Sequence, residues 1–271
     1  RDLVKTRDEI HTLSGEIGNM TGVLRGVLPY ISSSTLQHAG QEPAEDGNEA
    51  AARDLALLFT DIRGFTTFSE GKSPEKVIEA LNRCHELQAT AILDNHGDID
   101  NVVGDGMFAR FDGPAKEINA CRAAFAIRAA MAELRRSAAA SGGSAFSIGI
   151  GISAGLVVTG PVGAAARRHF TAVGDRVNLA SRLEGANKAY GTWSLMTDAV
   201  ARVAARDFLC REIDLVAVKG TARPVRIHEL LAPKAKPGER APELARVFAA
   251  GLAAYRARQW QAAAKSFTLL A

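Results

Sequence analysis

Residues 55–67 read LALLFTDIRGFTT, and a second stretch, residues 101–111, reads NVVGDGMFARF. In each, an apolar run leads to a single aspartate, Asp61 or Asp105, with a glycine nearby. Apolar runs of this length are typical of buried strands, and Gly-Asp-Gly between two such runs indicates a turn. The sequence therefore predicts two carboxylates at adjacent strand ends.

Two carboxylates placed together indicate a site for divalent cations. A buried carboxylate is costly unless it is paired or binds a cation, and Mg²⁺ typically takes one or two protein carboxylates and fills its remaining positions with water and phosphate oxygens. After Asp61 the chain turns at Gly64, and free N–H groups at a helix start, Phe65 and Thr66, could hold a polyphosphate. The pair predicts a two-metal phosphoryl-transfer site, although each aspartate alone is more typical of a turn or cap.

Composition predicts a globular domain and sets limits on its function. A chain of 271 residues that is 47% hydrophobic can bury one sizeable core. The net charge of +3 is modest and the basic residues are scattered, so no nucleic-acid partner is expected. Cys84, Cys121 and Cys210 are widely spaced, which predicts buried, reduced thiols and a cytoplasmic domain.

The ends of the chain predict a fragment of a longer protein. The sequence begins at an arginine, without a signal-like segment, and a membrane anchor elsewhere in the full-length protein stays open. Residues 137–166 carry no charge, but isoleucines alternate with small residues there and Pro161 interrupts the run. This pattern predicts strand rather than a membrane-spanning helix.

Residues 1–36 predict a coiled-coil, signal-transducing helix. Apolar or small residues recur at alternating spacings of three and four, at Leu3, Thr6, Ile10, Leu13, Ile17, Met20, Leu24, Val27 and Ile31. Several glycines weaken such a helix, and Pro29 ends or kinks it, so the coil should be weak. A single amphipathic helix packed on its own domain is the alternative. The polar stretch 37–53 predicts a linker.

Residues 54–232 predict one α+β domain. Ser73-Pro74 has the form of a helix start, and a second helix follows from Pro114. Strand, helix, hairpin, helix and strand follow in order, which is typical of a ferredoxin-like sandwich with helices on one face of a mainly antiparallel sheet. Residues 233–271 predict a linker and a helical tail whose apolar pattern resembles a truncated tetratricopeptide repeat.

A further helix, residues 174–188, presents two polar side chains on one side. Asn178 and Arg182 lie four residues apart. An asparagine with an arginine one turn on can hydrogen-bond a sugar or phosphate and stabilise developing charge. Spacing alone favours an ordinary solvated face over a binding site.

Four blocks together resemble the catalytic domain of class III adenylate and guanylate cyclases, over about two thirds of the chain. They are FTDIRGFT (Phe59–Thr66), VGDGMFARF (Val103–Phe111), FTAVGDRVNLASRLE (Phe170–Glu184) and VKGTARPVRIHEL (Val218–Leu230). The resemblance implies the class III nucleotide cyclase fold and a homodimer with active sites between the subunits.

The resemblance also implies roles for individual residues. Asp61 and Asp105, with the Ile62 carbonyl, would hold two Mg²⁺ or Mn²⁺ ions that position the triphosphate and activate the ribose 3′-OH for attack on the α-phosphorus. From the partner, Asn178 would orient the ribose and Arg182 would stabilise charge on the α-phosphoryl group. Lys219 would contact the leaving phosphates.

The base-reading positions depart from the usual pattern. Adenylate cyclases of this family usually carry a lysine that reads adenine, four residues before the second metal aspartate. This chain has Asn101 at that position. By the same resemblance, Thr171 would contact the base together with Asn101. Guanylate cyclases usually carry a glutamate, which is also absent. An asparagine amide can serve adenine or, when flipped, guanine. ATP is favoured, with GTP or dual specificity as alternatives.

Other functions are less well supported. A catalytically silent, dimerising regulatory domain is disfavoured because the metal and transfer residues are all present. A dinucleotide-forming cyclase is disfavoured because VNLASR (residues 177–182) does not belong to that class. The coil implies an upstream sensor whose signal changes the geometry of the dimer.

Overall fold

The computed structural model describes residues 2–28, 31, 35–36, 50–140, 146–164, 167–217 and 224–270. Its sheet is built from β1 (Ala51–Arg63), β2 (Gly97–Val103), β3 (Gly106–Phe111), β4 (Ser147–Ala164), β5 (Arg167–Val173), β6 (Ser194–Thr197), β7 (Phe208–Val216) and β8 (Val225–Pro233). Within this described part the strand order is β2-β3-β1-β4-β6-β8-β7, and β5 pairs with β4.

The strand that carries Asp61, β1, lies between β3 and β4. Both pairings are antiparallel, whereas β4 and β6 run parallel. The predicted hairpin is confirmed, since β2 and β3 pair across Gly104 and Asp105. The first strand starts at Ala51, slightly before the predicted domain start at residue 54.

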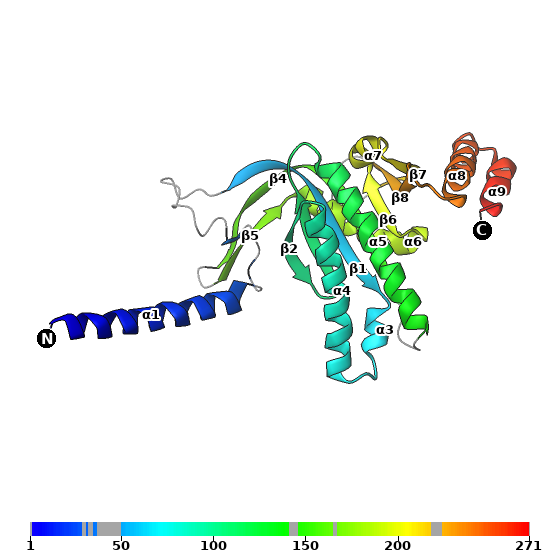
Figure 1. Ribbon diagram of the computed structural model, residues 1–271. Helices are drawn as coiled ribbons and strands as arrows, with labels where there is room; N and C mark the ends of the chain where they lie inside the picture. Colours follow the sequence, from blue (N-terminus) through cyan, green and yellow to red (C-terminus); the bar gives the residue numbers. More distant parts are fainter. Residues whose placement is uncertain are drawn as a thin grey trace.

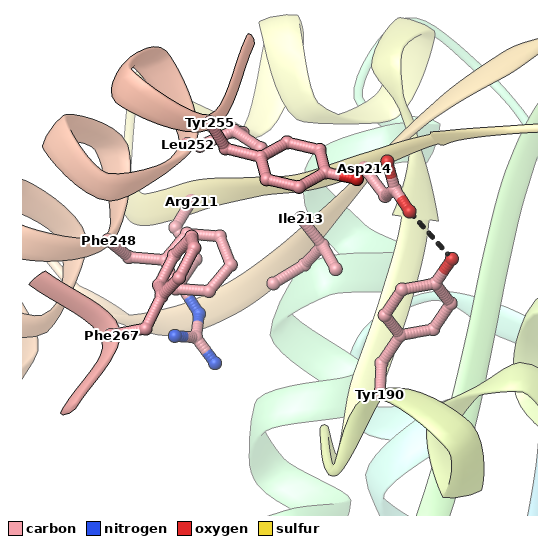
Figure 2. Close-up of a pocket in the computed structure, with 8 residues that line it drawn as sticks. All are labelled: Tyr190, Arg211, Ile213, Asp214, Phe248, Leu252, Tyr255 and Phe267. Carbon is pink, nitrogen blue, oxygen red and sulfur yellow. Dashed lines mark hydrogen bonds between the residues drawn. The ribbon is translucent and has the colours of Figure 1, made fainter. Parts of the chain in front are cut away.

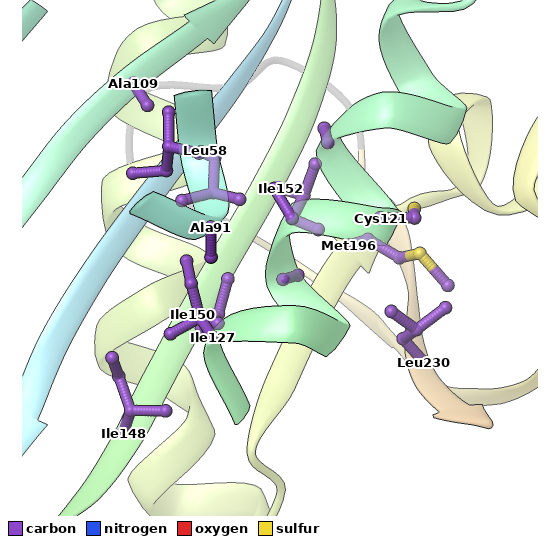
Figure 3. Close-up of a cluster of buried hydrophobic side chains, with 14 of the residues drawn as sticks. Leu58, Ala91, Ala109, Cys121, Ile127, Ile148, Ile150, Ile152, Met196 and Leu230 are labelled. Carbon is purple, nitrogen blue, oxygen red and sulfur yellow. The ribbon is translucent and has the colours of Figure 1, made fainter. Parts of the chain in front are cut away.

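Two long helices, α4 (Pro74–Asp94) and α5 (Lys116–Ala140), pack on one face of the sheet. Ser73 is the N-cap residue of α4 and Pro74 follows it, as the sequence predicts. The main core lies beneath these helices (Figure 3), and its buried members include Leu58, Ile92, Cys121, Ile127, Ile148, Ile150 and Ile152. The described cysteines are free thiols, two of them buried.

Another helix, α6 (Asp175–Tyr190), lies on the opposite face, so the expectation that the helices share one face is wrong for this element. The residues of β4 that alternate with its isoleucines are small, Gly149 and Gly151, and successive strand residues point to opposite faces. A Cβ on Gly151 would lie 2.1 Å from the Ala180 carbonyl oxygen and 2.3 Å from the Glu184 nitrogen. The helix backbone therefore rests directly on the strand.

The amino-terminal helix, α1 (Asp2–Val27), projects away from the sheet (Figure 1). Its glycines do not interrupt it. Ile17, Met20, Leu24 and Val27 keep the predicted spacing and are exposed in the single chain. Pairing of this helix with a second copy stays a prediction. Within the described residues, no helix has both the length and the apolar character needed to span a membrane.

Two short helices complete the domain, and a helical hairpin follows it. The short helices are α3 (Phe65–Ser69), after Asp61, and α7 (Asp198–Ala204), which the sequence pattern did not predict. The hairpin consists of α8 (Arg240–Arg256) and α9 (Trp260–Thr268), joined by contact of the Phe248 and Phe267 rings, whose centroids lie 5.3 Å apart. It packs on β7, where the Arg211 guanidinium lies 4.5 Å from the Phe248 ring centroid.

A pocket of about 330 Å³ lies between this hairpin, β7 and the end of α6 (Figure 2). Aromatic rings line much of it, and the Tyr190 hydroxyl donates to Asp214 at 3.0 Å at its edge. Neither Asp61 nor Asp105 lines this pocket. The hairpin therefore builds a surface of its own, away from the predicted metal site.

Candidate active site

The two predicted metal aspartates lie next to one another because the ends of β1 and β3 meet without an intervening side chain. A Cβ on Gly106 would lie 2.0 Å from the Thr60 carbonyl oxygen and 3.4 Å from the Asp61 Cα atom. The Met107 N–H donates to the Thr60 hydroxyl at 2.9 Å, and that hydroxyl donates to Gln88 of α4 at 2.5 Å. These bonds fix the Asp105 turn against the end of β1.

The electrostatics of the pair reflect this proximity. The pKa of Asp61 is raised to about 6, first by burial and then by the charge of Asp105 and a hydrogen bond between the two carboxyl groups, while Arg63 opposes the rise. Like charges this close favour a shared proton or a bound cation. Behind the turn, the His85 ring hydrogen-bonds the backbone of Asp105, while burial lowers the pKa of His85.

A third carboxylate, Glu184 of α6, faces the pair and was not predicted as a site residue. Its pKa is raised to about 7, first by burial and then by the charges of Asp61 and Asp105, against an opposing effect of Arg63. Its Oε1 atom occupies the space where a Cβ of Gly149 would stand, 2.5 Å away, and Gly149 is the β4 partner of Asp61. The signal for it was the glycine alternation in β4, which marks close approach of a helix.

The donor set fits a divalent cation bound mainly through water and phosphate. Among the described residues, no group of three or more His, Cys, Asp or Glu side chains is arranged to hold a metal ion. Two adjacent carboxylates match what Mg²⁺ takes from a protein when substrate phosphates supply other ligands. The guanidinium of Arg63 donates to the Thr192 carbonyl at 2.5 Å, and its charge lowers the pKa of both Asp61 and Glu184.

The predicted phosphate loop begins at Gly64, which adopts a left-handed conformation with φ of 82° and precedes α3. A side chain other than glycine is strained in this conformation. Phe65 is buried and packs on Phe68 and Phe146, whereas Thr66 is exposed. The turn that directs the chain away from Asp61 is thus formed by Gly64, as predicted.

The remaining predicted residues are distributed over other elements. Asn178 and Arg182 are both exposed on α6. Asn101 is exposed on β2, and Thr171 is buried on β5, where its hydroxyl donates to Asp100 at 2.5 Å. Lys219 lies outside the described residues.

Comparisons with known proteins identify the family of this chain. Residues 48–231 match the family described as the adenylate and guanylate cyclase catalytic domain. Adenylate cyclase 1 of Rhizobium meliloti is 35% identical over 82% of this chain, and the adenylate cyclase of Anabaena cylindrica is 32% identical over 85%. The chain spans 34% and 50% of the lengths of these two relatives.

Solved structures of cyclases are also similar to this chain. The adenylyl cyclase CyaB from P. aeruginosa is 30% identical, with a TM-score of 0.63, over 72% of this chain and 99% of that one. The guanylyl cyclase Cya2 is also 30% identical, with a TM-score of 0.59, over 70% of this chain and 97% of that one. With its two aspartates joined at the β1–β3 junction and its sequence matched from residue 48 to 231, the chain belongs to the class III adenylate and guanylate cyclase family.

Proposed function

We propose that this chain converts ATP to 3′,5′-cyclic AMP and pyrophosphate. The ribose 3′-oxygen attacks the α-phosphorus, loses its proton, and forms the second ester bond as the bond from the α-phosphorus to the leaving pyrophosphate oxygen breaks. The single observation that carries this proposal is the forced adjacency of Asp61 and Asp105 within the cyclase family match. The adenylate cyclases among its relatives favour ATP as the substrate.

Each predicted residue has a place in this scheme. Asp61 and Asp105, with the Ile62 carbonyl, would hold two Mg²⁺ or Mn²⁺ ions, which supply Lewis-acid stabilisation of the phosphoryl charge when bound. Backbone N–H groups after Gly64, at Phe65 and Thr66, face the phosphates.

The residues of α6 and the Lys219 turn act on the reacting groups. Asn178 orients the ribose and Arg182 stabilises charge on the α-phosphoryl group, since both are exposed on α6 and free to meet substrate. Lys219 meets the leaving pyrophosphate.

The active site lies between two copies of the chain, so that the aspartates of one subunit meet Asn178 and Arg182 of the other. An exposed apolar surface supports this dimer. Leu156 of β4 is 72% exposed, and Val158 and its β5 partner Val173 share its face of the sheet and are exposed as well. Apolar side chains gathered on a sheet face mark a protein interface.

Specificity for ATP over GTP is the finer part of the proposal. Asn101 replaces both the lysine usual in adenylate cyclases and the glutamate usual in guanylate cyclases, and its amide can rotate to suit either base. The guanylyl cyclase Cya2 and the adenylyl cyclase CyaB have the same sequence identity to this chain, 30%. Dual specificity is therefore the second candidate. An upstream sensor would act through α1, whose exposed apolar residues suit pairing with a second copy.

The test is cyclic nucleotide production by the purified protein with ATP and with GTP, in Mg²⁺ and then Mn²⁺. Asp105→Ala should lower cyclic AMP formation by about a hundredfold or more, while Asp94→Ala, an exposed aspartate at the end of α4, should leave it unchanged. Equal kcat/KM for the two nucleotides would replace ATP specificity by dual specificity. No turnover of either nucleotide with either metal would favour a silent, dimerising domain.

A further inference from the structure

Asp100 is a buried carboxylate next to the base-reading position Asn101. Its side chain is 0% exposed, and it occupies a β-bulge, because the pairing of β2 with β3 shifts register between Ile99 and Asn101. The bulge turns the Asp100 side chain toward β5, where it contacts Thr171 and Ala172. Asp100 therefore joins two strands that are not neighbours in the sheet.

Three donors converge on this carboxylate. The Thr171 hydroxyl donates to Oδ1 at 2.5 Å, and the Ala172 N–H donates to Oδ2 at 3.3 Å. The Arg110 guanidinium lies 3.5 Å from Oδ2 and is itself held by Asp98. Burial, and to a smaller extent the charge of Asp98, raise the pKa of Asp100, while these three groups oppose the rise by stabilising the charged form. Because its hydrogen-bond partners are donors, the carboxylate serves as an acceptor.

The bond from Thr171 has a consequence for base recognition. A threonine hydroxyl has one proton to donate and lone pairs that accept. When the proton is committed to Asp100, the hydroxyl can offer a ligand only its lone pairs. Adenine carries an exocyclic N6 amine, a donor, where guanine carries the O6 acceptor. A hydroxyl fixed as an acceptor suits adenine and faces guanine O6 with a second acceptor.

We propose that Asp100 is a positioning residue for base selection, which orients the Thr171 hydroxyl so that the site accepts adenine and disfavours guanine. This inference rests on the proposed cyclase function. Asn101 cannot discriminate alone, because its amide offers a donor and an acceptor that exchange on rotation. Asp100, acting through Thr171, supplies the fixed polarity that Asn101 lacks.

Asp100→Asn reverses this polarity with little change in shape. The new amide oxygen faces Ala172 N–H and Arg110, both donors, which places the amide N–H₂ against the Thr171 oxygen. The Thr171 proton is then released toward the base, where guanine O6 can accept it. The ratio of kcat/KM for GTP to that for ATP should rise about tenfold, the effect of one hydrogen bond gained and one lost.

A matched control lies on the same strand. Asp98→Asn removes the same charge beside Arg110 but leaves the bond from Thr171 in place, so its GTP to ATP ratio should stay within about twofold of the unaltered chain. In Thr171→Val, which has no hydroxyl, adding Asp100→Asn should not change the ratio further. If Asp100→Asn does not fold, Asp100→Ala serves, because it frees the Thr171 proton without introducing a donor or an acceptor.

Equal loss of both activities in Asp100→Asn, or a ratio shift that persists in the Thr171→Val background, would overturn the role of Asp100. Equilibrium binding of 3′-deoxy-ATP and 3′-deoxy-GTP, which lack the attacking hydroxyl, separates this result from failure of the proposed reaction. If the unaltered chain forms no cyclic nucleotide, the cyclase proposal fails, and a preference for 3′-deoxy-ATP that Asp100→Asn reverses would still support base selection. No such preference, or one that the variant leaves unchanged, would refute it.

Discussion

Gly106 and Thr60 are in direct backbone contact: a Cβ at position 106 would stand 2.0 Å from the Thr60 carbonyl oxygen. The strands that carry the two predicted metal ligands meet at this point. No side chain can occupy the space without moving β3 away from β1. The distance between the carboxylates of Asp61 and Asp105 therefore depends on the absence of a side chain at Gly106.

Gly106→Ala should weaken metal binding and activity together. The alanine methyl pushes the Asp105 turn outward, so we expect Mn²⁺ affinity to fall by about tenfold or more and the protein to lose about 1–3 kcal/mol of stability. Mn²⁺ titration followed by electron paramagnetic resonance and thermal denaturation measure the two effects. Gly185→Ala, on α6 with open space around it, is the control and should keep or slightly raise stability. Unchanged Mn²⁺ affinity in Gly106→Ala would show that this contact does not set the site.

Mixing two inactive variants should restore activity if the site is shared between chains. Asp105→Ala and Arg182→Ala damage different halves of the proposed site, so a mixed dimer keeps one intact site. Random exchange of equal amounts gives about half mixed dimers, each with one of two sites intact, and so about a quarter of full activity. The assay is cyclic AMP formation after co-refolding. Absence of recovery, in a sample shown to contain mixed dimers, would place all the residues in one chain.

Glu184→Gln should stabilise the metal-free protein at neutral and alkaline pH. The folded-state pKa of Glu184 is about 7, against 4.5 for the unfolded chain. The folded state therefore binds more protons between these values, and stability contributed by the protonated group is lost as pH rises through that window. The variant avoids this loss, so its advantage should reach about 1–2 kcal/mol above pH 7, after allowance for solvent screening, and vanish near pH 4.

Thermal denaturation from pH 4 to 8 in the presence of a chelator measures this difference. Glu79→Gln, at an exposed position of α4, provides the control and should show no pH-dependent gain. A gain for Glu184→Gln that is the same at every pH would contradict the charge repulsion among Glu184, Asp61 and Asp105.

Phe248→Ala should loosen the carboxy-terminal hairpin without unfolding the domain. The Phe248 ring packs beside Ile213 and Phe267 and lies against the Arg211 guanidinium (Figure 2). Loss of a partly buried ring costs about 1–3 kcal/mol, and we expect faster proteolysis in the segment before α8. Leu269→Ala, at a side chain that is 72% exposed, should be neutral. Equal proteolysis of the two variants would indicate that Phe248 does not hold the hairpin in place.

Local sequence patterns predicted most of the sheet and its long helices. The β2–β3 hairpin and the start of α4 at Ser73-Pro74 follow from turn and capping residues, which act over a few positions. The short helix α7 was missed because seven residues carry too little periodicity to distinguish it from a loop.

The parts of the site that were not predicted depend on contacts between distant segments. Glu184 belongs to the site only because α6 crosses β4 at Gly149 and Gly151. Asp100 reaches Thr171 only because of a bulge in β2. Asp61 and Asp105 could be predicted as a pair because the strands that carry them are neighbours in the sheet and each ends in a recognisable turn.

The two glycines of β4 under α6, Gly149 and Gly151, are subject to different constraints during evolution. At Gly151 a side chain would strike helix backbone, so every descendant that keeps this fold must keep the glycine. At Gly149 the nearest atoms that a side chain would meet are the carboxylate of Glu184 and, farther off, the Arg63 guanidinium, both of which belong to the candidate site. In a descendant that lost the activity but kept the fold, residues other than glycine would be tolerated at position 149 but not at position 151. The residues at these two positions therefore distinguish an active homologue from an inactive one that keeps the fold.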